Sequence, residues 1–296
     1  MGLSRSVEQY ADDISSTGAV WFAGSSSRQP PRSGIPVVHA PAGIVEYHPE
    51  EMTVSCGAGT TLADLDATLA ERGQYANLGQ AHQTAGTVGG ALAMGLDDHL
   101  RLGRGSMRDA LLRARFVDGR GRLVTAGGPT VKNVSGFDLC RLLVGSRGRL
   151  GGLADVILRT RPLPRHREWW HLSGLASPAG LVARLYRPSA VLWDGTSAWV
   201  HLEGHAADIA ALRRDLGSAV TVVDSPPDLS GYPYRSPSTG VESADAIVEV
   251  GTGVTHTRER VAPSAAPAAV RAIHDRLLDE FDPERRFAHG PHPLDW

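Results

Sequence analysis

The sequence predicts an α+β protein of two domains, and three observations lead to this class. The chain has 296 residues, more than the roughly 100–200 typical of one domain. Short apolar strands mix with amphipathic helices up to Pro162 and Pro164, where the pattern changes. From there the segments run strand, helix, strand, strand, helix, strand, the order of a ferredoxin-like layer. We therefore expect a first domain over 1–165, a smaller ferredoxin-like cap domain over 166–225, and a segment over 226–296 that completes them.

Periodicity and capping residues define the elements of the first domain. Thr61 begins a helix, because it offers a capping hydroxyl three residues before Asp64, and Gly73 ends it. The turn Asp118–Gly121 joins two apolar runs and predicts a hairpin. The remaining elements expected here are helices over Ser4–Ser16 and Leu139–Val144 and strands over Ala19–Ala23, Gly43–Tyr47, Met52–Ser55 and Leu153–Thr160.

The rest of the chain contains the cap and a closing segment. The cap elements are strands over Trp169–Leu172, Ala190–Trp193, Ala198–Leu202 and Ala219–Val223 and helices over Ala179–Tyr186 and Ala206–Leu216. Ser225–Gly240 is rich in Pro, Ser and Gly and predicts a mobile loop. A strand over Ala246–Val250 and a helix over Ala268–Phe281 follow, with Val270, Ile273, Leu277 and Leu278 at the spacing of a buried helix face.

Composition excludes several classes of function. A net charge of −2 gives no field that attracts nucleic acid or an acidic membrane. The sequence contains no run of 18 apolar residues, so no transmembrane helix is predicted. The only cysteines, Cys56 and Cys140, lack metal-site spacing, which excludes an iron–sulfur cluster ligated by cysteines of this chain alone. We expect no metal site and a cytoplasmic location, with any membrane contact made through partner subunits.

Glycine-bearing turns are the strongest functional signal. Cys56–Leu62 follows a strand and opens a helix, but its third glycine is missing and no parallel βαβ unit surrounds it, which disfavours a Rossmann site. Other glycine segments occur at Gly24–Ser27, Gly86–Gly90, Lys132–Asp138 and Gly145–Gly151. Successive backbone N–H groups in such turns can bind anions, and one diphosphate would account for all four segments.

Five stretches in this order resemble a known family. They are "GIVEYHPEEMTVSCGAGTTLADLDATLAERG", "GTVGGALA", "RGSMRDALL", "VDGRGRLV" and "VKNVSGFDLCRLLVGSRGRLG". Together they resemble the FAD-binding E subunits of glycolate oxidase, flavoproteins of the vanillyl-alcohol-oxidase or PCMH type, over most of residues 5–165. The resemblance implies a PCMH-type FAD-binding domain before the cap.

The resemblance also implies which residues hold FAD. The flavin is expected to be noncovalent, because no histidine stands in the first loop or immediately before Gly105, where covalent relatives attach it. In Lys-Asn-x-x-Gly-Tyr-Asp, the family motif, Phe137 replaces the usual tyrosine. The implied FAD-binding residues are Gly24, Ser25, Ser26, Ser27, Gly86, Thr87, Gly89, Gly90, Ala93, Gly105, Ser106, Asp109, Asn133, Gly136, Asp138, Gly148 and Gly151.

What the flavin does stays open between several hypotheses. Catalytic relatives carry a histidine and an acidic Gly-Asp-Gly-Asn segment in the cap, where this chain has Val248–His256. His256 is either the base that accepts the hydroxyl proton while the flavin oxidises a small 2-hydroxy acid, or a structural histidine. The chain is accordingly a self-sufficient dehydrogenase, or an FAD-carrying subunit beside a catalytic flavoprotein and an iron–sulfur subunit, or a scaffold that has lost tight FAD binding. Trp169, Trp170 and Tyr232–Tyr234 are expected partner contacts.

Overall fold

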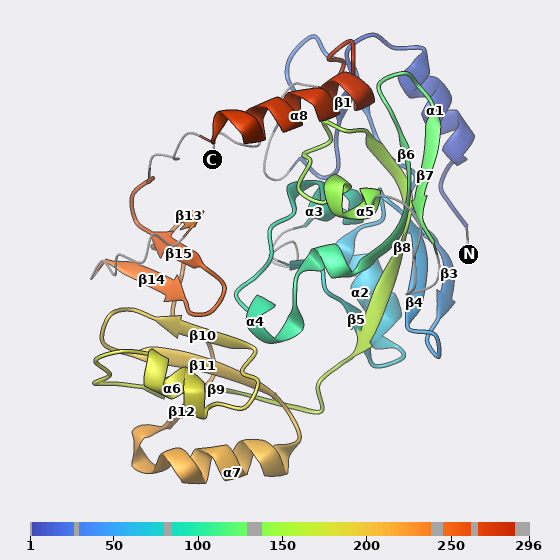
Figure 1. Cartoon of the computed structure of the whole chain (residues 1–296). Coiled ribbons are helices and arrows are strands. Elements are labelled where there is room, and N and C mark those ends of the chain that lie inside the picture. The colour runs from blue at the N-terminus through green and yellow to red at the C-terminus, as the bar shows by residue number, and fades with distance from the viewer. Residues whose placement is uncertain are drawn as a thin grey trace. The chain divides into compact units, whose positions relative to one another are not determined.

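A computed structural model describes residues 2–26, 30–79, 85–128, 138–237, 245–261 and 266–287 (Figure 1). The chain forms two compact units. Unit 1 comprises residues 1–97, 106–163 and 265–295, and unit 2 comprises 98–105 and 164–264. Residues 98–105 therefore leave the first unit for the second, and the closing helix returns to the first.

The elements of unit 1 surround one antiparallel sheet. In chain order they are α1 (Val7–Ser15), β1 (Trp21–Phe22), β2 (Val37–Val38), β3 (Ile44–His48), β4 (Thr53–Gly57), α2 (Leu62–Ala70), β5 (Gln74–Ala76), α3 (Val88–Met94), a 3₁₀ turn (Met107–Asp109), β6 (Leu111–Val117), β7 (Leu123–Gly127), α5 (Leu139–Leu143), β8 (Gly152–Pro162) and α8 (Ala268–Phe281). The strand order is β3-β4-β8-β6-β7, and β5 also pairs with β8. The short β1 and β2 pair separately and in parallel.

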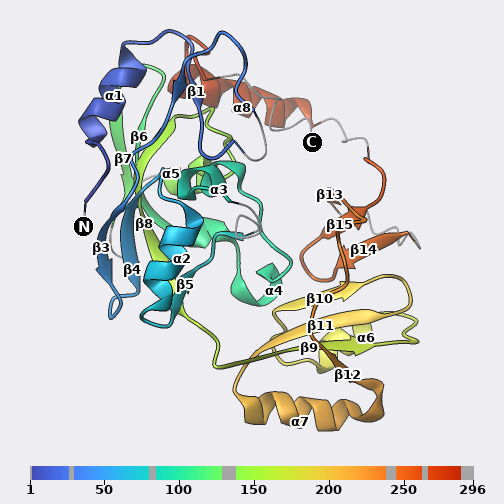
Figure 2. The same ribbon diagram turned by 180° about the vertical axis from the view of Figure 1, so that it is seen from behind.

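The central strand β8 is buried because helices cover both faces of this sheet. Leu158 and Val156 of β8 belong to the core that α2 and α3 complete with Leu65 and Leu92 (Figure 2). Ala154 faces the opposite way, into a second core with Ile14 of α1. Strict alternation would put Ala154 on the same face as Val156 and Leu158, but the β6–β8 pairing shifts register at Ala154, and this bulge lets one strand supply both cores. The hydroxyl of Thr61 accepts a hydrogen bond from the N–H of Asp64, as the predicted cap of α2 requires.

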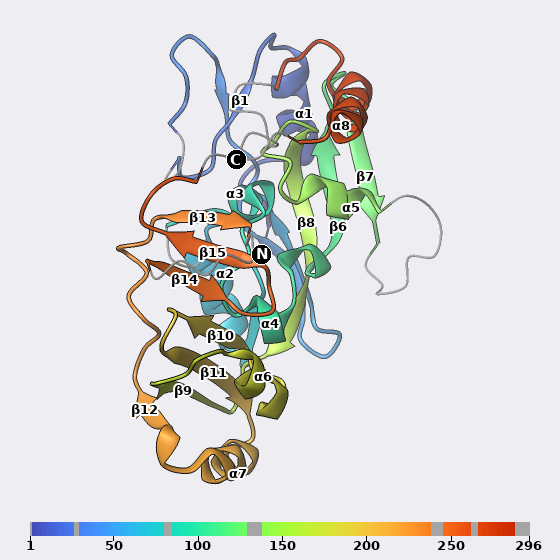
Figure 3. The same ribbon diagram turned by 60° about the vertical axis from the view of Figure 1, so that its left-hand side comes forward.

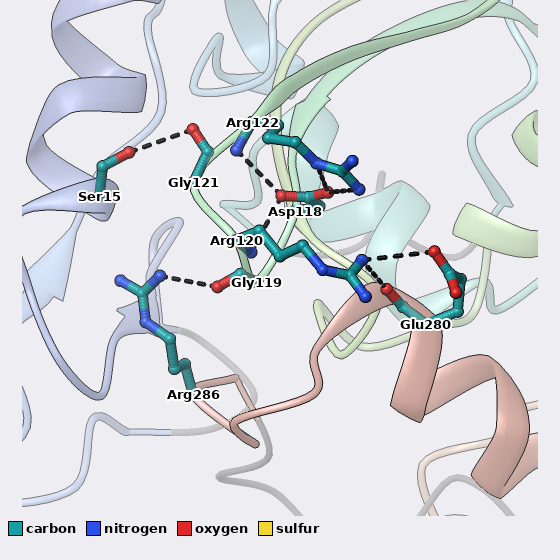
Figure 4. Close-up of polar contacts among 8 residues, drawn as sticks. All are labelled: Ser15, Asp118, Gly119, Arg120, Gly121, Arg122, Glu280 and Arg286. Atoms are coloured by element: carbon teal, nitrogen blue, oxygen red, sulfur yellow. Dashed lines mark hydrogen bonds and ion pairs between the residues drawn. The ribbon is translucent and has the colours of Figure 1, made fainter.

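The end of the described chain joins the N-terminal helix to the β6–β7 turn (Figure 4). Asp282, which is fully buried, accepts hydrogen bonds from the N–H groups of Arg286 and Phe287, both at 2.8 Å. The Arg286 guanidinium then donates to the carbonyls of Gly119 and Gly18, also at 2.8 Å. In the turn itself, Asp118 accepts from the guanidinium and the N–H of Arg122, each at 2.9 Å. These hydrogen bonds, and no disulfide, hold the end of the described chain against the N-terminal segment and the β6–β7 turn.

Unit 2 is a seven-stranded antiparallel sheet (Figure 3). Its elements are α4 (Arg101–Arg104), β9 (His166–Leu172), α6 (Ala179–Arg184), β10 (Ala190–Trp193), β11 (Ala198–Gly204), α7 (Ala206–Leu216), a 3₁₀ turn (Gly217–Ala219), β12 (Thr221–Val223), β13 (Tyr234–Pro237), β14 (Ala246–Glu249) and β15 (Val254–Thr257). The strand order is β12-β9-β11-β10-β14-β15-β13. Its first four strands have the arrangement of a ferredoxin-like unit, which confirms the predicted order of elements.

Three expectations are wrong in part. Ser225–Gly240 is not a continuous loop, because Tyr234–Pro237 forms β13 and pairs with β15. Ile273 and Val270 of α8 are 59% and 43% exposed, since only the C-terminal part of that helix, around Leu278, packs into the core. The apolar run Leu142–Val144 predicts three core residues, but Leu142 in α5 is 38% exposed, while Leu143 and Val144 are buried. Spacing identified these helices, but it could not identify which turn of each would meet the core.

Candidate cofactor site

A cavity in unit 1 is enclosed by segments that lie far apart in the sequence. It holds about 550 Å³ of empty space, open mouth included. Its walls come from α1, the turn after β1, the turns before α2 and α3, and the loop that leads into β8. The described residues that line it are Tyr10, Phe22, Ala23, Gly24, Val38, Ala40, Ala58, Gly59, Thr87, Gly89, Gly90, Ala93, Ser146, Arg147, Gly148, Gly151, Gly152 and Leu153.

The first and second glycine turns meet at Gly24 and Thr87. A Cβ added to Gly24 would lie 2.4 Å from the hydroxyl oxygen of Thr87, so only glycine fits there. That hydroxyl caps α3 by accepting a hydrogen bond from the N–H of Gly90 at 3.2 Å. The N–H of Gly89 donates to the carbonyl of Ala58 at 2.7 Å. The second turn is therefore tied to both the first turn and the turn before α2.

The fourth glycine segment closes on the end of α3. The N–H groups of Gly145 and Arg147 donate to the carbonyls of Leu92 and Ala93 at 2.9 and 2.8 Å. These bonds satisfy carbonyls that the end of a helix leaves without a partner in the helix. The cavity wall between Ala93 and Gly148 is thus built from backbone, with few side chains in the way.

Aromatic rings form the side of the cavity near β8. The ring of Phe22 lies so close to Gly148 and Gly152 that added Cβ atoms would approach it to 3.2 and 2.4 Å. The Tyr10 hydroxyl would lie 2.5 Å from a Cβ on Gly152. Burial raises the pKa of Tyr10 well above its usual value, so its hydroxyl remains neutral.

The structure brings seven of the residues predicted to bind FAD to this cavity and places others elsewhere. Lining it are Gly24, Thr87, Gly89, Gly90, Ala93, Gly148 and Gly151. Described residues that do not line it are Ser25, Ser26, Gly86, Gly105, Ser106, Asp109 and Asp138. Ser27, Asn133 and Gly136 lie outside the described residues. The role of all of these residues in binding FAD stays a prediction.

Three of the residues away from the cavity have visible structural partners. The Ser106 hydroxyl donates to the carboxylate of Asp97 at 2.9 Å. Arg141 pairs with Asp109 at 2.7 Å and with Asp138 at 3.1 Å. Asp138 also accepts from the N–H of Arg141 as the cap of α5. These contacts hold α5 beside the turn that precedes β6.

Sequence reasoning missed several lining residues. Ala58 and Gly59 belong to the turn that was set aside as a poor Rossmann motif, although its Gly-Ala-Gly pattern carried the signal. Arg147 had no such signal, because arginines are common on surfaces. It is half-buried, and burial together with the charge of Arg149 lowers its pKa to about 10.

The candidate base His256 lies in unit 2, within a buried network. Its side chain is 4% exposed, and its Nε2 lies 2.7 Å from Oε1 of Glu249. Arg235 donates to the same carboxylate at 2.9 Å, and the Thr252 hydroxyl donates to it at 3.0 Å. Burial disfavours the charged carboxylate, but the hydrogen bond from His256 and the charge of Arg235 prevail and lower the pKa of Glu249 to about 2. Glu249 therefore stays ionised and holds His256.

A second charged group lies between α4 and the same sheet. The Arg104 guanidinium donates to Glu203 at 3.2 Å, and the Ser189 hydroxyl donates to that carboxylate at 3.0 Å. His201 packs its ring 4.6 Å from the ring of Trp169, centroid to centroid. Burial lowers the pKa of His201 to about 4, against a smaller opposing effect of Glu203. His201 is therefore neutral at pH 7.

The aromatic residues expected to contact a partner differ in their exposure. Trp170 is fully buried in the core of unit 2 and is wrong as an exposed anchor, because it lies on the sheet face that packs against α7. Trp169, on the alternate face, is partly buried between His201 and His99. Tyr234 is 42% exposed on β13, and Arg258 lies over the ring of Tyr232. The two tyrosines stay candidates for a partner surface.

Part of the chain that contributes to the cavity is similar to known FAD-binding proteins. Residues 22–127 match the model of a family described as FAD binding domain. This stretch of the chain is therefore similar to an FAD binding domain. The chain is 32% identical to glycolate oxidase subunit GlcE of Escherichia coli over 71% of this chain and 63% of that protein. It is also 36% identical to D-lactate dehydrogenase of Archaeoglobus fulgidus, over 41% of this chain and 27% of that protein.

Solved structures agree on the fold. An alkyldihydroxyacetonephosphate synthase superposes with a TM-score of 0.67 at 12% identity, over 95% of this chain and 74% of that chain. These findings confirm the resemblance and the α+β, PCMH-type fold, and they support FAD as the cofactor. The chain spans less than two thirds of the length of the curated relatives named above.

The cavity fits such a cofactor. Its walls offer backbone at Gly24, Gly90 and Gly148, where side chains would obstruct the space, and its aromatic and aliphatic side suits a ring system. No group of three His, Cys, Asp or Glu among the described residues could hold a metal ion. No helix in the described ranges is long and apolar enough to cross a membrane.

Proposed function

We propose that this chain is the FAD-carrying subunit of a glycolate-oxidase-like complex that oxidises a 2-hydroxy acid. It holds FAD noncovalently in the cavity of unit 1 and acts with a catalytic flavoprotein and an iron–sulfur subunit. The observation that carries the proposal is the cavity itself, because glycine turns at Gly24, Gly59, Gly89–Gly90 and Gly148–Gly152 converge on it. Bound FAD supplies a two-electron acceptor, and the protein supplies the shape and charge around it.

The state of His256 supports an FAD-carrying role over self-sufficient catalysis. A general base must reach the proton it removes, within roughly 3 Å of the substrate hydroxyl. Here the Nε2 of His256 is bonded to an ionised Glu249, and the side chain is nearly inaccessible. The same carboxylate is shared with Arg235, so the group is already a closed network of opposite charges. A catalytic base from a partner flavoprotein is then required.

Two measurements test the proposal. We expect the purified chain to be yellow and to release FAD, not FMN, into the supernatant when it is denatured in acid. Colour that stays with the precipitate would contradict noncovalent binding. With glycolate or D-lactate and an artificial dye, the isolated chain should show negligible turnover, and activity should appear when a second flavoprotein subunit and an iron–sulfur subunit are added. Robust turnover by the isolated chain that is lost in His256→Ala would restore the self-sufficient dehydrogenase.

A further inference from the structure

Arg147 is distinctive among the residues that line the cavity of unit 1. Of the described lining residues, it alone carries a charge. The others are glycine, alanine and larger apolar residues, with hydroxyls only at Tyr10, Thr87 and Ser146. A cavity whose described lining is neutral except for one cation favours a ligand with an anionic part.

The backbone fixes the position of Arg147 at a cost. Its φ is +57°, in the left-handed region that disfavours any residue with a Cβ, and the nearby Gly145 and Gly148 adopt φ of +85° and +75°. The bond from its N–H to the carbonyl of Ala93 holds it there. Glycine would fit this backbone with less strain, so local conformation does not explain why arginine stands at this position.

The surroundings of Arg147 disfavour its charge. The side chain is partly withdrawn from water, and the nearby Arg149, which is only 7% exposed, adds a second positive charge. Both effects lower the pKa of Arg147. An anion placed in the cavity would act in the opposite direction and favour the charged guanidinium.

We propose that Arg147 is the cationic contact for the diphosphate of FAD in this cavity. The inference rests on the proposed function, because it assumes that FAD occupies the cavity. A guanidinium offers paired donors that match phosphate oxygens, while the glycine turns at Gly24 and Gly90 let backbone approach the same group. Arg147 is thus a binding residue that favours a dinucleotide over ligands without the diphosphate.

The test compares two glycine substitutions in apoprotein. Arg147→Gly removes the guanidinium and also relieves the left-handed strain, so the fold should be retained. Arg187→Gly is the matched control, because Arg187 has φ of +50° and is exposed in unit 2. The dissociation constant for FAD is measured by calorimetry at low and high salt, and ADP and adenosine are measured as competitors. Arg147→Lys tests whether charge alone restores affinity.

We expect Arg147→Gly to weaken the binding of FAD and of ADP by about ten-fold to one-hundred-fold, which is the range for the loss of a hydrogen bond to a charged group. Adenosine should be unaffected, and the FAD affinity of the variant should depend less on salt than that of the wild type. Arg187→Gly should leave every affinity unchanged, and Arg147→Lys should recover part of the loss. Equal FAD affinity in wild type and Arg147→Gly, or an equal loss for adenosine, would overturn the inference alone. A wild-type chain that binds no FAD would overturn the proposed function with it.

Discussion

The cavity of unit 1 is lined mostly by glycine, alanine and aromatic residues, whereas the sheet of unit 2 buries carboxylates against arginines. In the cavity, backbone turns define the space and Arg147 is the one described charge. In unit 2, Glu249 meets Arg235 and His256, and Glu203 meets Arg104. The first region surrounds an open space with backbone and one arginine, whereas the second pairs its buried carboxylates with cations of its own sheet and of α4.

This difference separates a ligand site from a structural network. A buried charge that has an opposite charge and further hydrogen bonds is already compensated, so it gains little from a ligand. Glu249 accepts bonds from an arginine, a histidine and a threonine. Perturbed pKa values occur in both regions, and they identify a functional site only where the group also faces a cavity.

The largest effect is expected when the unit 2 network loses its carboxylate. Glu249→Ala leaves Arg235 and His256 close together without the charge between them, and the free energy of unfolding should fall by about 3–5 kcal/mol. Urea denaturation followed by circular dichroism measures it. Arg213→Ala is the control, because Arg213 is 44% exposed in its pair with Glu168 and should cost less than about 1 kcal/mol. Equal costs for the two variants would remove the contrast between a closed network and a surface pair.

A second effect should appear in the pH dependence of stability. The unfolded chain protonates His201 near pH 6.5 and the folded chain only near pH 4, so the unfolded state binds more protons between these values. Stability should therefore fall as the pH falls through this window. The gap, at about 1.4 kcal/mol per pH unit, corresponds to roughly 3 kcal/mol. Denaturation curves at pH 7 and pH 4 measure it, and His201→Asn should reduce the difference; an unchanged difference would show that other groups cause it.

The sequence predicted the order of the helices and strands better than it predicted the partners of the buried charged side chains. The cap of α2 at Thr61 and the ferredoxin-like order both rest on local signals, and both are present. Three of the four predicted glycine segments line the cavity, because glycine marks backbone that must approach something closely, whereas the segment Lys132–Asp138 lies outside the described residues except for Asp138, which does not line it. The partners of Glu249 could not be predicted, because β13, β14 and β15 are separate segments whose pairing is set by the sheet.

Arg147 and Ile273 show two further limits. An arginine between glycines carries no local sign that it will line a cavity. Ile273 lies at the spacing of a buried face, yet α8 continues past the part of the core it covers. Periodicity gives the face of a helix, and tertiary packing decides how much of that face is covered.

The smallest change to the fold, and the finest test of the contrast, is a methyl group at Gly90. A Cβ there would have the Thr87 hydroxyl at 3.1 Å as its one neighbour within 4 Å, apart from the adjoining residues and the backbone of α3. Alanine also favours a helix by about 1 kcal/mol over glycine, so Gly90→Ala should change the free energy of unfolding by less than about 1 kcal/mol. The added methyl would still occupy cavity space, and FAD affinity should fall.

Gly180→Ala in α6 is the control, because nothing lies within 4 Å of its Cβ position and it belongs to unit 2. Calorimetry with FAD and thermal unfolding of both variants should separate the effects: stability similar to or above that of the wild type in each, and weaker FAD binding in Gly90→Ala only. Unchanged FAD affinity in Gly90→Ala would mean that the cofactor does not approach this turn.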